Sequence, residues 1–209
     1  MKAHFRHINL KQANAMLRDK EPSEIIEWVL QHANRPVLTT NFGPYSATLI
    51  HAVTKVHKDM DVIWCDTGYN TPNTYRYANS LIDNLSLNMH IYAPKFTTGY
   101  LDTTMGIPQI NTDEHRLFTE KVKLEPFNRA LKEHDPDVWF TNLRKGQTTF
   151  RSNLDILHIN KRGILKVSPF FYYNEFEMEL YLQKFDLPNE KKYFDPTKVL
   201  TARECGLHL

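Results

Sequence analysis

The sequence predicts an α/β domain built on a largely parallel sheet, and two observations support this. Strand-like and helix-like segments alternate along the first half of the chain, the order produced by strand–helix–strand units with right-handed crossovers. Residues 61–66, DVIWCD, form an almost unbroken apolar run of the kind found in buried parallel strands. With 209 residues, the chain is long enough to bury a sizeable core.

The first half begins with a helical region and continues with the alternating elements. Residues 9–34 have helical spacing, with Ser23 after Pro22 as a candidate N-cap and an apolar stripe from Ile25 to Leu30. Strands are then expected at 35–42, 61–66 and 88–93, and helices at 45–56 and 72–87.

The second half is less regular. Residues 95–120 are polar and rich in glycine and proline, so we expect an irregular, mobile surface segment. Beyond it we expect helices at 126–134 and 175–185 and strands at 137–141, 156–159 and 164–167. We interpret residues 1–209 as a single domain with N-terminal helices at 1–34, an α/β core at 35–185 and an extended tail at 186–209.

Composition excludes several classes of protein. The net charge of +2, from 26 basic and 24 acidic side chains, is too small for a protein that binds nucleic acid by bulk charge, so any anion site must be local. Two cysteines cannot hold an iron–sulfur cluster or a cysteine-rich zinc site. No segment is typical of a signal peptide or a membrane span. We predict a cytoplasmic protein with free thiols and no metal.

The first candidate site is the segment Thr39-Thr40-Asn41-Phe42-Gly43, which follows a predicted strand. Open parallel sheets bind ligands beyond the carboxyl ends of their strands. Short polar side chains and backbone N–H groups at a helix start suit phosphate or sulfate there. Taken alone, the segment is better interpreted as an ordinary strand-to-helix turn.

The second candidate is Asp66-Thr67-Gly68-Tyr69, at the carboxyl end of the strand at 61–66. Its carboxylate and hydroxyl groups could position a sugar or a base. Asp, Thr and Gly are also common turn residues, so a purely structural turn remains the alternative.

The third candidate, residues 142–151, follows the strand at 137–141 and contains three cations within ten residues. Arg144, Lys145 and Arg151 are these cations, and Gln147 adds a further polar group. Arginine forks bind phosphate and sulfate oxygens in pairs of hydrogen bonds. A solvated charged loop is the alternative, but the convergence of three polar segments on one sheet edge favours an anion site.

The tail contributes a candidate nucleophile. Cys205 lies between Arg203 and His208, which would favour its reactive thiolate form. Cys65 lies within an apolar strand instead, so we interpret it as an inert core thiol.

Together these segments resemble the thioredoxin-dependent phosphoadenosine phosphosulfate (PAPS) reductases. The most specific match is Glu204-Cys205-Gly206-Leu207-His208, which looks like that family's carboxyl-terminal ECGLH signature. The other matches are Thr39–Gly43, Asp66–Tyr69, Val122–Leu131, Leu143–Arg151 and Lys166–Pro169.

The resemblance implies a doubly wound sheet of the adenine-nucleotide α-hydrolase type with a mobile catalytic tail. It implies that Cys205 attacks the sulfur of PAPS, releases adenosine 3′,5′-bisphosphate and carries an S-sulfocysteine. Reduced thioredoxin or glutaredoxin would then release sulfite, as a step of assimilatory sulfate reduction, without an iron–sulfur cluster or other cofactor. Relatives also suggest a homodimer.

The resemblance also assigns roles. Substrate-binding residues would be Thr39, Thr40, Asn41, Phe42, Gly43, Asp66, Thr67, Gly68, Tyr69, Arg144, Lys145, Gln147, Arg151 and Lys166. Catalytic residues would be Arg203, Glu204, Cys205 and His208. The family's long segment before the tail is missing here, which leaves two alternatives. One is a cluster-free reductase of adenosine phosphosulfate (APS), and the other is a nucleotide-binding relative without turnover.

Overall fold

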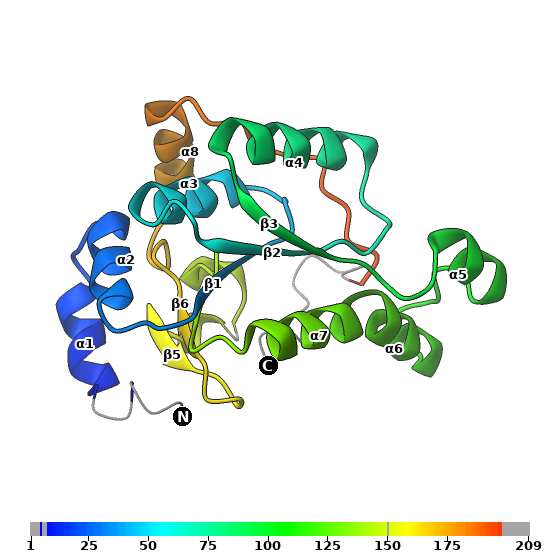
Figure 1. Cartoon of the computed structure of the whole chain (residues 1–209), viewed down its shortest axis with the longest axis horizontal. Helices are drawn as coiled ribbons and strands as arrows, with labels where there is room; N and C mark the ends of the chain where they lie inside the picture. The colour runs from blue at the N-terminus through cyan, green and yellow to red at the C-terminus, as the bar shows by residue number, and fades with distance from the viewer. Residues whose placement is uncertain (1–4, 6–7, 150, 198–209) are drawn as a thin grey trace.

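A six-stranded sheet forms the centre of the computed structural model, which describes residues 5, 8–149 and 151–197 (Figure 1). The strands are β1 (Pro36–Thr40), β2 (Asp61–Cys65), β3 (Asn88–Tyr92), β4 (Val138–Phe140), β5 (Leu157–Ile159) and β6 (Leu165–Val167). The α-helices are α1 (Leu10–Leu17), α2 (Pro22–Leu30), α3 (Ser46–Val56), α4 (Pro72–Leu85), α5 (Thr98–Thr104), α6 (Asp113–Thr119), α7 (Glu125–His134) and α8 (Glu175–Lys184).

The strand order is β3-β2-β1-β4-β6-β5. All neighbouring strands are parallel except β5, which is antiparallel to β6. Because the chain proceeds from β1 toward β3 in one direction and from β4 toward β5 in the other, the sheet is doubly wound. The order reverses between β1 and β4, which is where such sheets bind ligands. The predicted fold class is confirmed.

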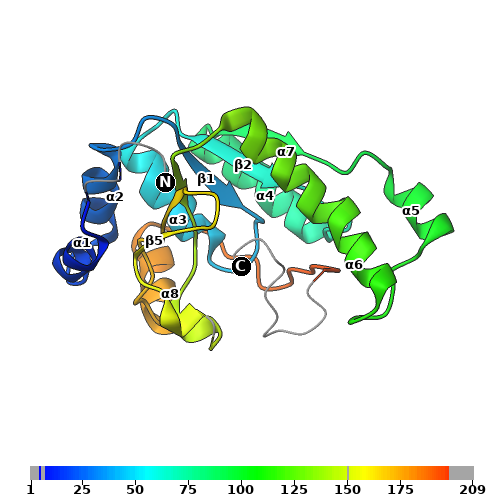
Figure 2. The same cartoon turned by 90° about the horizontal axis from the view of Figure 1, so that it is seen from below.

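Helices cover both faces of the sheet (Figures 1 and 2). Alternate residues of each strand point to opposite faces, so Leu38 packs into the large core cluster with α2, α3 and α8, while Val37 packs with α7. The paired helices α5 and α6 extend from one end of the molecule in both views. They have a small core of their own, made by Leu101, Phe118 and Val122.

Two predictions of local structure are wrong. Residues 9–34 form two helices instead of one, because α2 begins at Pro22, with Glu21 as its extended N-cap in a capping box with Glu24. The predicted N-cap Ser23 therefore lies inside α2. Residues 95–120 are not irregular, since they contain α5 and α6, whose N-caps Thr97 and Thr112 accept backbone hydrogen bonds of 3.2 and 3.1 Å.

A π-helical turn, η2 (Glu120–Leu124), joins α6 to α7. The wider turn changes which side chains face the sheet, and such turns occur often at functional sites. It turns Lys123 into the interior, where the whole residue is 6% exposed. Among the described helices, none combines the length and apolarity that a membrane crossing requires.

Candidate functional site

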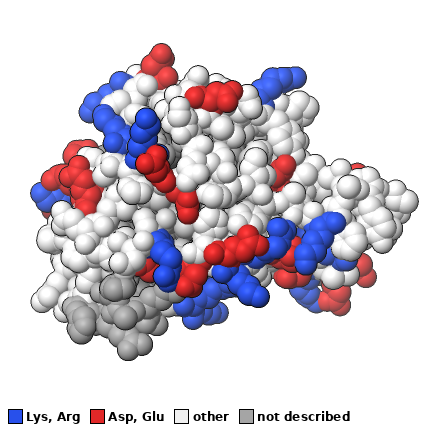
Figure 3. Space-filling model, in the orientation of Figure 1, with Lys and Arg blue, Asp and Glu red and all other residues white. Residues whose placement is uncertain are grey.

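A cavity of about 870 Å³ lies at the point where the strand order reverses, within the size range of small-molecule sites. The ends of β1 and β4 line it, together with the loop after β4 and the start of α3. Lys123, Tyr193 and Asp195 line it from the η2 side and from the segment after α8. Lys/Arg and Asp/Glu side chains intermix on the visible surface, as expected if any anion site is local (Figure 3).

The loop after β1 satisfies two of its own amides. The Thr40 hydroxyl oxygen accepts a hydrogen bond from the Phe42 amide (3.0 Å), and Asn41 Oδ1 accepts one from the Gly43 amide (3.1 Å). Thr39, Thr40 and Asn41 line the cavity. Phe42 does not, because its backbone turns to a φ of +51° and its fully buried ring packs in the core. Phe42 therefore anchors the loop in the core in this structure, whereas the resemblance assigned it to substrate binding.

The loop after β4 brings a buried cation to the cavity. The Arg144 guanidinium lies 4.9 Å from the centre of the Tyr45 ring, and the residue is 8% exposed. Its Nε is buried without a hydrogen-bond partner in the described part of the chain. Burial lowers the pKa of the Arg144 guanidinium. A buried donor of this kind is costly unless a ligand satisfies it, and an anion would do so best.

Two more residues of this loop, Gln147 and Arg151, are held together at the cavity wall. Gln147 Oε1 accepts hydrogen bonds from the Arg144 amide (3.0 Å) and from the Arg151 guanidinium. Lys145 lies outside the cavity lining, with its exposed side chain over the Tyr172 ring at 5.5 Å. The loop therefore presents two of its three predicted cations to the cavity.

Lys166 is placed differently from its predicted position. It is fully buried on β6, and its ammonium lies 4.4 Å from the centre of the Trp139 ring. It does not line the cavity, whereas Trp139 does. Lys166 therefore supports the wall behind Trp139 in this structure.

The turn after β2 also lies off the cavity lining, and its polar groups have partners of their own. Asp66 accepts hydrogen bonds from the Gly68 amide (2.9 Å) and the Tyr75 hydroxyl (2.9 Å). The Tyr69 hydroxyl donates to Asp102 (2.8 Å), and its ring contacts the small core of the α5–α6 pair. Thr67 is buried, and its side chain accepts the Tyr69 amide hydrogen bond.

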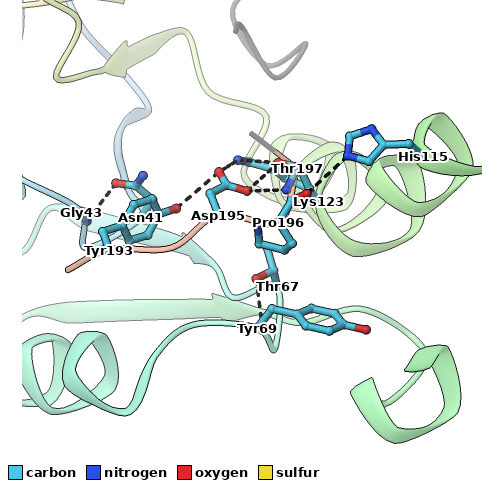
Figure 4. Close-up of polar contacts among 10 residues, drawn as sticks. All are labelled: Asn41, Gly43, Thr67, Tyr69, His115, Lys123, Tyr193, Asp195, Pro196 and Thr197. Carbon is cyan, nitrogen blue, oxygen red and sulfur yellow. Dashed lines mark hydrogen bonds and ion pairs between the residues drawn. The ribbon is translucent and has the colours of Figure 1, made fainter. Parts of the chain in front are cut away.

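Residues 189–197, here called the covering segment, lie over this edge of the sheet (Figure 4). Asn189 Oδ1 accepts a hydrogen bond from the Tyr45 amide (2.9 Å), and the Tyr193 ring lies against Gly43. In Figure 4, Pro196 lies between Thr67 and the Lys123–Asp195 pair. The covering segment therefore lies between the turn after β2 and this ion pair, both members of which line the cavity.

A buried ion pair holds the covering segment. Lys123 and Asp195 form it with 7% and 2% of their side chains exposed. Burial by itself raises the pKa of the Asp195 carboxyl, but the Lys123 charge and two hydrogen bonds from Thr197 outweigh it, so the pKa lies below its ordinary value. The His115 Nε2 contact with the Pro196 carbonyl (3.3 Å) adds a second attachment.

Sequence reasoning missed Lys123 and Asp195 as a functional pair. The signal available was the position of Lys123 inside the segment resembling the reductases, but nothing in the sequence connects it to a residue 72 positions away.

The prediction for Cys65 also needs refinement. This thiol lines the cavity, yet burial raises its pKa to about 12, so it is protonated and unreactive at neutral pH. Arg203, Glu204, Cys205 and His208 lie outside the described residues.

Comparisons with known proteins agree with this geometry. The family model for the phosphoadenosine phosphosulfate reductase domain matches residues 35–196. Phosphoadenosine 5′-phosphosulfate reductase of a Synechococcus species is 32% identical over 183 residues, which cover 86% of this chain and 78% of that protein. The Escherichia coli protein of the same name is 34% identical over 184 residues, covering 87% of this chain and 75% of that protein.

Solved structures support the fold. A phosphate complex of PAPS reductase from Candida auris is similar with a TM-score of 0.76 and 24% identity, covering 86% of this chain and 87% of that one. The U34-tRNA thiolase NcsA from Methanococcus maripaludis, a structure with a [4Fe-4S] cluster, has a TM-score of 0.57 at 12% identity, covering 90% and 69%. At these identities the likeness concerns the fold alone.

Proposed function

Because this chain belongs to the phosphoadenosine phosphosulfate reductase domain family, we propose that it reduces 3′-phosphoadenylyl sulfate to sulfite and adenosine 3′,5′-bisphosphate. One observation connects the proposed reaction to a particular site in the structure. The buried Arg144 guanidinium faces a cavity at the strand-order reversal, and its Nε has no partner among the described residues. A site with this unmet donor is suited to a highly charged anion.

The anion subsite follows from the cavity wall. Arg144 and Arg151 would contact the phosphosulfate or the 3′-phosphate, with Gln147 fixing their relative positions. Thr39, Thr40 and Asn41 would contribute hydroxyl and amide groups from the end of β1. Cations aimed at developing negative charge in a site shielded from water can each supply several kcal/mol to the reaction.

The adenosine part would extend toward the turn after β2. Asp66, Thr67, Gly68 and Tyr69 retain the assignment that the resemblance gives them. In this structure Pro196 lies between Thr67 and the Lys123–Asp195 pair that lines the cavity, so these residues would reach the nucleotide once residues 193–197 move. Substrate binding and displacement of the covering segment are therefore coupled in this proposal.

The chemical step would use Cys205 as nucleophile. Its thiolate would attack the sulfur of the substrate, form an S–S bond and break the bond between sulfur and the phosphate oxygen, which leaves as adenosine 3′,5′-bisphosphate. Arg203 and His208 would stabilise the thiolate or the leaving charge. A thiolate of reduced thioredoxin would then attack Cys205 and release sulfite, and the external dithiol would supply both electrons.

The decisive measurement is the intact mass of the reduced protein after mixing with PAPS, and separately with APS, without thioredoxin. We expect PAPS to add about 80 Da, the mass of an SO3 group, at Cys205. An adduct formed with APS alone would identify an APS reductase. Binding of either nucleotide without any adduct would support a non-catalytic relative.

Two serine variants provide the matched control. Cys205→Ser should abolish both the adduct and sulfite release while leaving nucleotide affinity nearly unchanged. Cys65→Ser should leave both intact, because the Cys65 thiol is protonated at neutral pH. Equal losses in both variants would contradict the assignment of Cys205.

A further inference from the structure

Asp61, His90 and His134 form a compact cluster at the other end of the sheet from the cavity. Asp61 begins β2, whose last residue, Cys65, lines the cavity. The His90 Nε2 atom lies 3.0 Å from Asp61 Oδ1, and the His134 Nδ1 atom lies 3.1 Å from Asp61 Oδ2. The two imidazole rings have their centres 4.6 Å apart, edge to face. All the potential ligand atoms lie within 4.8 Å of one another.

Three separate elements build this cluster. In the parallel register, Asp61 pairs with Asn88 and Ile63 with His90, so Asp61 and His90 point to the same face of the sheet. That face is covered by α7, as Ile63 and Tyr92 pack with it. His134 is the last residue of α7, which brings its ring onto the two strands.

Neighbouring residues hold the cluster in place. The Asn88 side-chain amide donates to Asp61 Oδ1 at 2.8 Å, which orients the carboxylate. The Tyr92 ring lies 6.1 Å from the His134 ring, and its hydroxyl donates to Glu133. The His134 side chain is only 11% exposed, so its position is fixed by packing. Oriented ligands of this kind raise metal affinity.

Two imidazoles and a carboxylate are a typical ligand set for zinc. Zinc bonds of about 2.0–2.2 Å place neighbouring ligands of a tetrahedral site about 3.3 Å apart, close to the two N–O distances here. A metal ion inserted between these atoms would replace the two hydrogen bonds, and ligand atoms that lie up to 4.8 Å apart would close on it. The carboxyl end of α7 also favours a nearby cation.

We propose that Asp61, His90 and His134 bind a divalent transition-metal ion of the zinc class. The ion would link β2, β3 and the end of α7, and solvent would complete its coordination. Because the cluster lies at the amino end of β2, away from the cavity, the ion would stabilise the sheet and take no part in the chemistry. The assignment does not depend on the proposed function.

The test uses the full chain without a histidine tag and adds ZnCl2 or CoCl2 to metal-free protein. Calorimetry is expected to give one tight Zn²⁺ site per chain, and Co²⁺ should produce visible absorption bands of low coordination number. His90→Ala and His134→Ala should each weaken Zn²⁺ binding at least about tenfold. Asn88→Ala should weaken it less, and the exposed His32→Ala should leave it unchanged.

Two measurements keep the test decisive if a histidine variant folds poorly. The X-ray absorption spectrum of the wild-type zinc complex should show nitrogen and oxygen ligands with imidazole scattering and no sulfur. Zinc should raise the melting temperature of the wild type and of the double variant Cys65→Ser/Cys205→Ser equally. Zinc–sulfur bonds, binding unaffected by His90→Ala and His134→Ala, or no tight binding by the wild type would each overturn the proposal.

Discussion

The loop after β4 and the turn after β2 follow the carboxyl ends of parallel strands, so both lie at the same edge of the sheet. Their polar groups differ in whether they have hydrogen-bond partners. In the turn after β2, Asp66 and Tyr69 are bonded to neighbouring protein groups. In the loop after β4, Arg144 keeps a buried Nε without a partner in the described residues. Because an unmet buried donor costs folding free energy, its presence marks the loop after β4 as the part of this edge prepared for a ligand.

The largest expected effect concerns the ion pair that holds the covering segment. Lys123→Met leaves the Asp195 carboxylate buried without its counter-ion, which should weaken docking of the covering segment by about 3 kcal/mol. We expect trypsin to cleave at the exposed Lys191 and Lys192 much faster in this variant. Lys123→Met combined with Asp195→Leu should restore most of the resistance, and unchanged cleavage in Lys123→Met would show that the pair does not hold the segment.

The second prediction compares two adjacent cations of the loop after β4. Arg144→Met should weaken nucleotide binding by about 2 kcal/mol, roughly 30-fold, because charged hydrogen bonds to the ligand are lost. The exposed Lys145→Met should change it by less than about threefold. Calorimetry with adenosine 3′,5′-bisphosphate measures both. Equal losses of nucleotide affinity in the two variants would mean that the loop acts only through its total charge. The ligand-free Arg144→Met protein should lose no more than about 1–2 kcal/mol of stability, because the guanidinium contact with the Tyr45 ring is lost but its Nε has no hydrogen bond to lose.

A third prediction concerns the pH at which the covering segment undocks. The folded pKa of Asp195 lies below its ordinary value of 3.8, so its ion pair contributes stability above that value and loses it as the pH falls through the folded pKa. The covering segment should therefore remain docked from neutral pH to about pH 4 and undock below it. Titration of the Asp195 carboxyl carbon by NMR would check this, with circular dichroism as a control for global unfolding. A midpoint above 3.8 would be inconsistent with the ion pair.

The smallest effect is expected at the turn after β2. Tyr69→Phe removes only the hydroxyl that donates to Asp102, which should cost about 0.5–1 kcal/mol of stability. Nucleotide affinity should change by less than about threefold. A tenfold loss would mean that the Tyr69 hydroxyl itself leaves Asp102 for the ligand, so that the turn binds the nucleotide through this hydroxyl.

The sheet was predictable because its evidence is local. The alternating elements and the apolar run of β2 predict the strands and their parallel pairing without reference to distant residues, whereas the strand order was not predicted. The helices α5 and α6 were missed because their polar sequences carry little apolar periodicity, and their threonine caps are short signals. Two helices were merged because residues on both sides of the break before Pro22 have helical spacing.

The candidate site was predictable in composition but less so in geometry. Sequence placed Arg144, Gln147 and Arg151 after a strand, and the structure puts them on the cavity wall. The sequence could not distinguish these three residues from Lys145 or Lys166, because whether a cationic side chain is exposed or buried depends on tertiary packing. The burial of Phe42 and the pairing of Lys123 with Asp195 arise from contacts that no local pattern encodes.

The Lys123–Asp195 pair also sets the local concentration of the proposed nucleophile. Cys205 follows Asp195 by ten residues, so an extended chain can carry it at most about 35 Å from that anchor. If the covering segment is released back to Asn189, the limit becomes about 56 Å. Because the effective concentration on a flexible tether falls roughly as the −3/2 power of its length, the shorter tether concentrates the thiol about twofold around the cavity. One buried pair thereby acts on the encounter rate of a residue ten positions farther along the chain.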